Sequence, residues 1–185
     1  RILATYPQMI HHPEHNFTQI VFLKIDCPHD GALKSLCHNF FREIDSILGT
    51  DYVRHYGEKR HGVESMIALM SQLANTYAIG LLVIDEMQHL NLGKAGGAER
   101  MLNFFVTLVN EISVPVVMVG TPKARPIFET DLRSARRGAG FGSILWEPLR
   151  KPTADKNVDQ TEWGAFTRKL WKYQWLTKAS DTVLD

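Results

Sequence analysis

Cysteine, long apolar runs and an excess of one charge are all missing from this sequence, and each absence excludes a class of protein. Only two cysteines occur in 185 residues, Cys27 and Cys37. This excludes a disulfide-stapled secreted domain and predicts two buried free thiols. No apolar run approaches the roughly 20 residues of a membrane span. The formal charge is +1, so any basic surface for nucleic acid must be local.

The first 15 residues lack the apolar core and the small-residue cleavage site of a secretory leader. They also lack a starting Met, so we expect a fragment or a processed chain. His11, His12 and His15 lie close together in the sequence, but no Cys or carboxylate pattern completes a tetrahedral metal site. We therefore expect a polar loop there.

The remaining sequence predicts strands that alternate with helices. The strand segments are apolar and rich in β-branched residues, whereas the helical segments repeat their apolar residues at a spacing of three to four. Asp30 and Gly49 are expected to cap the first helix. The expected strands are residues 17–26, 79–85, 114–121 and 143–149, and the expected helices are 30–49, 63–77, 98–112, about 124–129 and 161–176.

Strands that are apolar on both faces predict an α/β fold with a mostly parallel sheet covered on both sides. Residues 1–150 would form this core, and residues 151–185 a linker and the start of a helical region. Ligands of such sheets lie beyond the carboxyl ends of the strands. Residues 81–86, "LLVIDE", place Asp85 and Glu86 at such an end.

Four apolar residues followed by Asp-Glu form the Walker B pattern of P-loop ATPases. Asp85 would hold Mg²⁺ through its waters, and Glu86 would orient the water that attacks ATP. The alternative is a strand that merely ends in a polar loop. Thr121 follows the next apolar strand, where a sensor of the γ-phosphate is expected.

A basic segment follows Thr121. Residues 123–151 hold seven basic and three acidic side chains. Arg133, Arg136 and Arg137 are candidates for an arginine finger that reaches a neighbouring subunit's nucleotide. The alternative is a solvated basic loop.

Four stretches together resemble one family: "LLVIDEMQHL", "FFVTLVNEISVPVVMVGTPKA", "RRGAGFGSILWEPL" and "LWKYQW". They are similar to TnsC and its relative TniB, the AAA+ ATPase regulators of bacterial cut-and-paste transposons. The resemblance spans roughly residues 1–176. It implies a truncated three-layer P-loop NTPase core and the start of a helical lid from residue 151.

The resemblance also implies a function. The protein would use ATP and Mg²⁺, assemble on target DNA as a ring or filament in the bacterial cytoplasm, and link a target-selection protein to transposase subunits. No membrane is involved. Asp85 and Glu86 would be the Walker B pair, Thr121 the sensor-1 position, and either Arg136 or Arg137 the trans-acting finger.

The sequence departs from the family in one motif. A P-loop requires G-x-x-x-x-G-K-[ST], and its backbone N–H groups cradle the phosphates. This motif is absent, and Gly93-Lys94 lies on the wrong side of the acidic pair. We therefore expect that the P-loop precedes Arg1, that residues 1–7 are the tail of its helix, and that the chain alone binds ATP poorly. Residues 143–149 would then lack their usual neighbouring strand.

Residues 51–62 read as a polar connection that could follow a phosphate backbone. Arg54, Lys59 and Arg60 would supply the charge, beside Tyr52 and Tyr56. A solvated loop is the alternative. Two other functions stay open for the whole protein: an AAA+ ATPase of the replication-initiator or helicase-loader type, and a non-catalytic interaction platform. The aromatic helix at Trp163 would pack in the lid or core, or dock a partner.

Overall fold

The computed structural model describes residues 3–57, 61–90, 98–124, 144, 147, 149 and 161–173. The chain divides into two compact units, residues 1–140 and 141–185. The predicted domain boundary at residue 150 and the predicted strand 143–149 fall mainly outside the described residues and stay predictions. The second unit contains one described helix, α7 (Glu162–Trp171), whose first turn is capped by the Thr161 hydroxyl.

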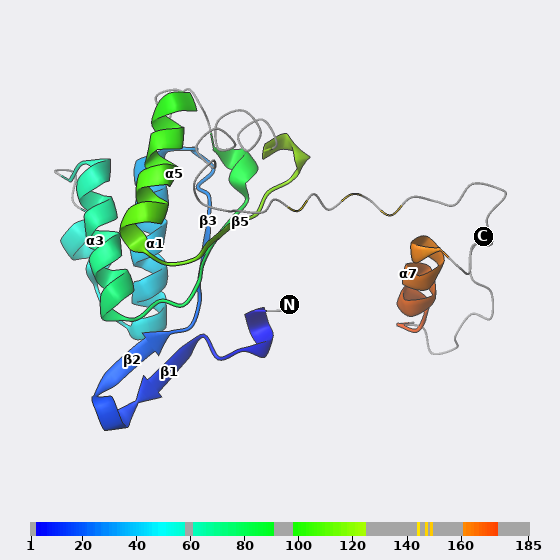
Figure 1. The fold of residues 1–185 in the computed structure, drawn as a ribbon, viewed down its shortest axis with the longest axis horizontal. Helices are drawn as coiled ribbons and strands as arrows, with labels where there is room; N and C mark the ends of the chain where they lie inside the picture. Colours follow the sequence, from blue (N-terminus) through cyan, green and yellow to red (C-terminus); the bar gives the residue numbers. More distant parts are fainter. Residues whose placement is uncertain are drawn as a thin grey trace. The chain divides into compact units, whose positions relative to one another are not determined.

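The first unit begins with an antiparallel hairpin and continues with a parallel sheet and its helices (Figure 1). Short 3-10 turns lie between several of these elements. The elements are η1 (Leu3–Thr5), β1 (Met9–His12), η2 (Pro13–His15), β2 (Phe17–Ile20), β3 (Leu23–Asp26), α1 (Leu33–Leu48), α2 (Tyr52–Tyr56), α3 (Val63–Thr76), β4 (Leu82–Asp85), η3 (Met87–His89), α5 (Ala98–Ile112), β5 (Val116–Met118) and η4 (Pro122–Ala124).

The sheet order is β3-β4-β5, and both pairings are parallel. Each crossover therefore steps in the same direction across the sheet, and right-handed crossovers place their helices on one face. Figure 1 shows α1, α3 and α5 together beside the strands. The mixed α/β fold with a parallel sheet is confirmed.

The core lies between this helical layer and the sheet. Leu23, Ile25, Leu82 and Ile84 alternate along β3 and β4 and are buried. They meet the apolar stripes of the helices, of which Phe40, Phe41 and Phe105 are the largest fully buried members. Burial of such side chains stabilises the fold by about 1.5–3 kcal/mol each.

The predicted strand at 17–26 is wrong as one element. Residues 17–20 pair with β1 in the antiparallel hairpin, whereas residues 23–26 join the parallel sheet. The chain changes partners at Val21, whose N–H donates to the carbonyl of Gln8, while the carbonyl of Ile20 accepts from Gly80. A Cβ on Gly80 would lie 2.7 Å from the carbonyl oxygen of Val21, so this change requires glycine.

Two other predicted segments differ from the structure. His11 and His12 belong to β1 and not to a loop, because each ring contacts a polar side chain of β2 across the hairpin. Residues 52–56 form α2, although the segment was expected to lack regular structure. The Asp45 carboxylate of α1 accepts from the N–H groups of Tyr52 and Val53, and this contact starts the short helix.

The helix caps and strand lengths differ in detail from those that the sequence predicts. Gly49 ends α1 with φ +69° as expected, but its N-cap is Ala32. Asp30 still accepts from the Ala32 N–H and the Ser35 hydroxyl. β4 and β5 are shorter than predicted, and residues 3–5 form a 3-10 turn rather than the tail of a helix. No helix in the described part of the chain could cross a bilayer.

Candidate active site at the carboxyl edge of the sheet

The parallel register brings the ends of three strands to one edge of the sheet. Asp26 of β3 pairs with Asp85 of β4, and Ile84 pairs with Met118 of β5. The pairing continues past the strand ends, because the N–H of Cys27 donates to the carbonyl of Asp85. Thr121 lies three residues beyond β5 and is exposed. Two aspartates and a threonine from distant sequence positions therefore lie along one edge.

A lysine joins the two aspartates. Lys24 and Asp26 alternate with buried residues along β3, and the register places them with Asp85 on the sheet face opposite the helices. Nζ of Lys24 is 2.8 Å from Oδ1 of Asp26 and 3.2 Å from Oδ2 of Asp85. The hydrogen bond to Asp26, with a smaller contribution from Asp85, raises the pKa of Lys24 above 10.5 despite partial burial. This ion-paired group was not predicted, because the apolar pattern of residues 17–26 indicated a strand buried on both faces.

The backbone turns sharply between the two acids of the predicted Walker B pair. Glu86 has φ +58° and ψ +35°, a left-handed conformation that is uncommon outside glycine. Oδ1 of Asp85 accepts from the Glu86 N–H at 2.8 Å. The turn separates the carboxylates: that of Asp85 faces Lys24, whereas that of Glu86 faces η3. The Asp85 side chain is 28% exposed and that of Glu86 is 49% exposed, so both are open to ligands.

Residues of η3 surround Glu86. The amide nitrogen of Gln88 donates to Oε2 of Glu86, and Nε2 of His89 lies 3.7 Å from the same oxygen. The amide oxygen of Gln88 accepts from the N–H of Thr121 at 2.9 Å. The His89 ring meets that of His29 edge to face, with 4.5 Å between ring centroids. Gln88 therefore connects the acidic pair to the loop that carries Thr121.

A buried thiol lies beneath the edge. Cys27 donates to the sulfur of Met87 at 3.6 Å. Burial raises the pKa of Cys27 to about 12, and the negative charges of Asp26, Asp85 and Glu86 contribute. Burial likewise raises the pKa of Cys37 to about 12. Both cysteines are free and buried, as the sequence predicted, and neither thiol is a nucleophile near neutral pH.

The predicted DNA-contact residues are placed only in part. Arg54 is 81% exposed on α2, 3.7 Å from Asp51. Tyr52 and Tyr56 stack on each other but face inward: the Tyr52 hydroxyl meets that of Tyr77 at 2.6 Å, and the Tyr56 ring lies against Phe41. These tyrosines are not presented for base stacking. The other basic candidates, Lys59, Arg60, Arg133, Arg136 and Arg137, lie outside the described residues.

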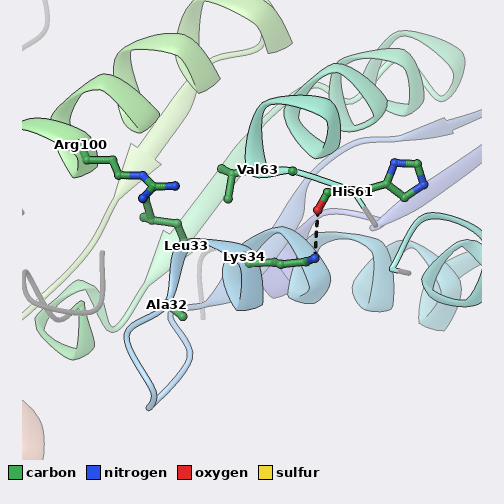
Figure 2. A pocket seen from close by; sticks show the side chains of 7 residues that line it. Ala32, Leu33, Lys34, His61, Val63 and Arg100 are labelled. Carbon is green, nitrogen blue, oxygen red and sulfur yellow. Dashed lines mark hydrogen bonds between the residues drawn. The ribbon is translucent and has the colours of Figure 1, made fainter. Parts of the chain in front are cut away.

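A basic cavity of about 330 Å³ lies where three helices begin. Lys34 of α1, His61 before α3 and Arg100 of α5 contribute its polar lining. In Figure 2 the Arg100 guanidinium extends toward Leu33, and Nζ of Lys34 donates to the His61 carbonyl at 2.9 Å.

The position of these cations on their helices is unusual. Lys34 and Arg100 lie in first turns, at the positive ends of the helix dipoles, where cations are unfavourable by about 0.3–1 kcal/mol each. An anionic ligand would offset this cost, as Asp30 does in part at α1. No local sequence pattern indicates this cavity, because residues 34, 61 and 100 are far apart along the chain.

The donor set at the edge fits a hydrated Mg²⁺ ion, which prefers carboxylate oxygens and retains most of its waters. Asp85 would hold it, with Glu86 beside it. The fit to the triphosphate is incomplete, because the sequence lacks G-x-x-x-x-G-K-[ST]. In the part of the chain that the structure describes, no group of three or more His, Cys, Asp or Glu side chains could hold a metal by itself.

Comparison with known proteins agrees with the fold. A family model described as an AAA domain matches residues 1–128, more than two thirds of the chain. No curated protein matches the chain. AAA domains are P-loop ATPase domains that generally use ATP and Mg²⁺. By this match and by its parallel α/β fold, the chain belongs to the AAA domain family of P-loop ATPases.

Proposed function

We propose that this chain supplies the metal- and water-positioning side of the ATPase site in a regulator of DNA transposition of the TnsC and TniB type. The observation that carries the ATPase part is the carboxyl edge of the sheet, where Glu86 directly follows Asp85 at the end of β4 and Gln88 links Glu86 to the backbone of Thr121. The transposition part rests on the wording of the sequence motifs, such as "DEMQHL" and "VGTPKA".

Each residue at the edge would have a distinct role. Bound Mg²⁺ would neutralise charge on the phosphates of ATP. Asp85 would hold the metal's waters. Lys24 would then lose its contact with Asp85 and keep the one with Asp26. Glu86, on the other side of the turn, would accept a proton from the attacking water. Thr121 would lie within reach of the γ-phosphate, and Arg136 or Arg137 would act on a neighbouring subunit's nucleotide.

Target DNA is the proposed macromolecular ligand. Arg54, Lys59 and Arg60 are the candidates from the sequence, and the basic cavity lined by Lys34 and Arg100 adds a second group of cations. Both groups of cations would bind phosphates of the DNA backbone. Self-association into a ring or filament, a target-selection protein and transposase subunits complete the proposed assembly, in the bacterial cytoplasm.

The test is Glu86→Gln in the natural polypeptide that contains residues 1–185. This substitution keeps the size of the side chain but removes the base, so we expect ATP hydrolysis to fall by about 10²–10⁴-fold while ATP binding persists. Gln72→Leu on the exposed face of α3 is the control. If Glu86→Gln leaves target selection and transposition unchanged, the protein is instead a non-catalytic platform.

A second measurement separates transposition from the initiator and helicase-loader alternatives. The natural polypeptide would be added with ATP to a transposase and its target DNA, and insertion would be scored. Stimulation of insertion that Glu86→Gln alters supports the proposal. A protein that loads a replicative helicase and leaves insertion unchanged would contradict it.

A further inference from the structure

Gln88 lies between two groups to which the sequence assigned separate roles. Its side-chain nitrogen donates to Oε2 of Glu86, and its side-chain oxygen accepts from the N–H of Thr121 at 2.9 Å. One short, rigid amide therefore touches both the proposed base and the proposed phosphate sensor. No sequence motif predicted a role for Gln88.

The chemistry of the two partners determines the orientation of the amide. A backbone N–H can only donate, so the end of Gln88 that faces Thr121 must be the oxygen. An ionised carboxylate can only accept, so the end that faces Glu86 must be the nitrogen. A flipped amide would oppose donor to donor and acceptor to acceptor, and this arrangement is therefore excluded.

The loop that carries Thr121 is packed closely against η3. The N–H of Met87 donates to the carbonyl of Val119 at 3.0 Å. A Cβ on Gly120 would lie 3.1 Å from Cβ of Met87 and 3.3 Å from Oε1 of Gln88. Such close packing leaves little slack, so a displacement of the Thr121 backbone must move the Gln88 amide as well.

Glu86 is held in an uncommon conformation at the other end of this connection. Its φ of +58° costs about 1 kcal/mol or more in a residue other than glycine. The Asp85 carboxylate and the His89 N–H hold its backbone, and the Gln88 amide holds its carboxylate. The direction of the Glu86 carboxylate therefore depends on a residue whose own position is set by Thr121.

We propose that Gln88 is a positioning residue that couples the Glu86 carboxylate to the backbone of Thr121. This inference rests on the proposed ATPase function. A ligand phosphate that moves Thr121 would reorient Glu86 through the amide, so the base would be aligned only when the sensor is engaged.

Two substitutions distinguish the contact of the amide with Glu86 from its contact with Thr121. Gln88→Leu removes both contacts at nearly constant volume. Gln88→Glu keeps an oxygen that accepts from the Thr121 N–H but places a second carboxylate against Glu86. Gln72→Leu, on the exposed face of α3, is the matched control.

The structural readout uses the 185-residue chain and needs no nucleotide. Hydrogen exchange at the Thr121 amide should accelerate about tenfold in Gln88→Leu and stay within about twofold in Gln88→Glu. Glu86→Ala should accelerate the same amide, and in the Gln88→Leu background it should have no further effect, because the two substitutions break one connection. Additive effects, or unchanged exchange in Gln88→Leu, would overturn the coupling.

The catalytic readout uses the natural polypeptide that contains residues 1–185. Gln88→Leu and Gln88→Glu should both lower kcat about tenfold or more while KM for ATP stays within about twofold, as expected when a base is misaligned. A kcat equal to or above that of the unchanged protein would overturn the positioning role. If the unchanged protein does not hydrolyse ATP, the proposed function fails, and the exchange measurements still decide the coupling.

Discussion

The ammonium of Lys24 lies 3.2 Å from Oδ2 of Asp85, so the proposed metal-binding carboxylate is already paired with a cation. The same ammonium lies 2.8 Å from Oδ1 of Asp26 on the adjacent strand. Lys24 thus neutralises part of the negative charge that two parallel strands bring together. A metal ion that approaches Asp85 must compete with this lysine.

Removal of Lys24 should therefore strengthen binding of Mg²⁺. In the 185-residue chain we expect Lys24→Met to lower the dissociation constant for Mg²⁺ up to about fivefold, since partly exposed pairs of this kind contribute about 0–1 kcal/mol. Titration calorimetry or nuclear magnetic resonance would measure it. Arg42→Met, which removes a cation from the exposed face of α1, is the control. Weaker binding in Lys24→Met would show that Asp85 is not the metal ligand.

The two thiols should be inert in the folded protein. Because burial raises the pKa values of Cys27 and Cys37 to about 12, both are protonated at pH 8, and a thiol reagent should modify them only as fast as the protein unfolds. Complete modification by urea-unfolded protein is the control. Rapid reaction of one thiol in the native protein would contradict the burial.

The same shifts predict loss of stability in alkali. A thiol with a pKa of 9.0 in the unfolded chain and about 12 in the folded chain binds its proton more tightly when folded. Its contribution is complete below pH 9 and is lost as the pH rises toward 12, where the raised pKa of Lys24 acts in the same direction. Urea unfolding at pH 8, 9 and 10 should give a decreasing free energy of unfolding. Cys37→Ala should reduce this dependence.

Asp45 should be important for the stability of the first unit. Oδ1 accepts from Thr50 and from the Tyr52 N–H, each at 2.7 Å, and Oδ2 accepts from the Val53 N–H at 2.8 Å. Because Asp45→Ala leaves these donors without the carboxylate, we expect a loss of about 2 kcal/mol in the free energy of unfolding. Ser46→Ala, at the exposed neighbouring position, should change it by less than about 0.5 kcal/mol. If Asp45→Ala and Ser46→Ala lower the free energy of unfolding equally, Asp45 does not have this role.

The basic cavity yields a test of DNA binding. Arg100 is a better probe than Lys34, because Lys34 also holds the His61 carbonyl and its loss would disturb the fold. Arg100→Ala should weaken DNA binding and reduce the slope of log affinity against log salt by about one. Arg42→Ala should change neither. An unchanged salt slope in Arg100→Ala would remove the cavity from the proposed DNA surface, and Arg54→Ala would test α2 in the same way.

The sequence predicted some elements well because their signals are local. The apolar spacing of α1, α3 and α5 survives in the structure, since a helix must turn one face to the core whatever its neighbours are. The acid pair at the end of β4 is likewise a property of adjacent residues. By contrast, residues 17–26 read as one strand because β-propensity does not indicate which partner each half will join.

The sequence by itself determined that a parallel α/β protein would carry Asp85 and Glu86 at a strand end, because apolar periodicity and residue order are written along the chain. The tertiary structure decided which groups meet those acids. Register placed Lys24 and Asp26 beside Asp85, and the packing of the loop after β5 placed Thr121 against Gln88. Such contacts join residues up to 61 positions apart, and the physical reason is that hydrogen bonds and ion pairs depend on distance in space, which no local pattern encodes.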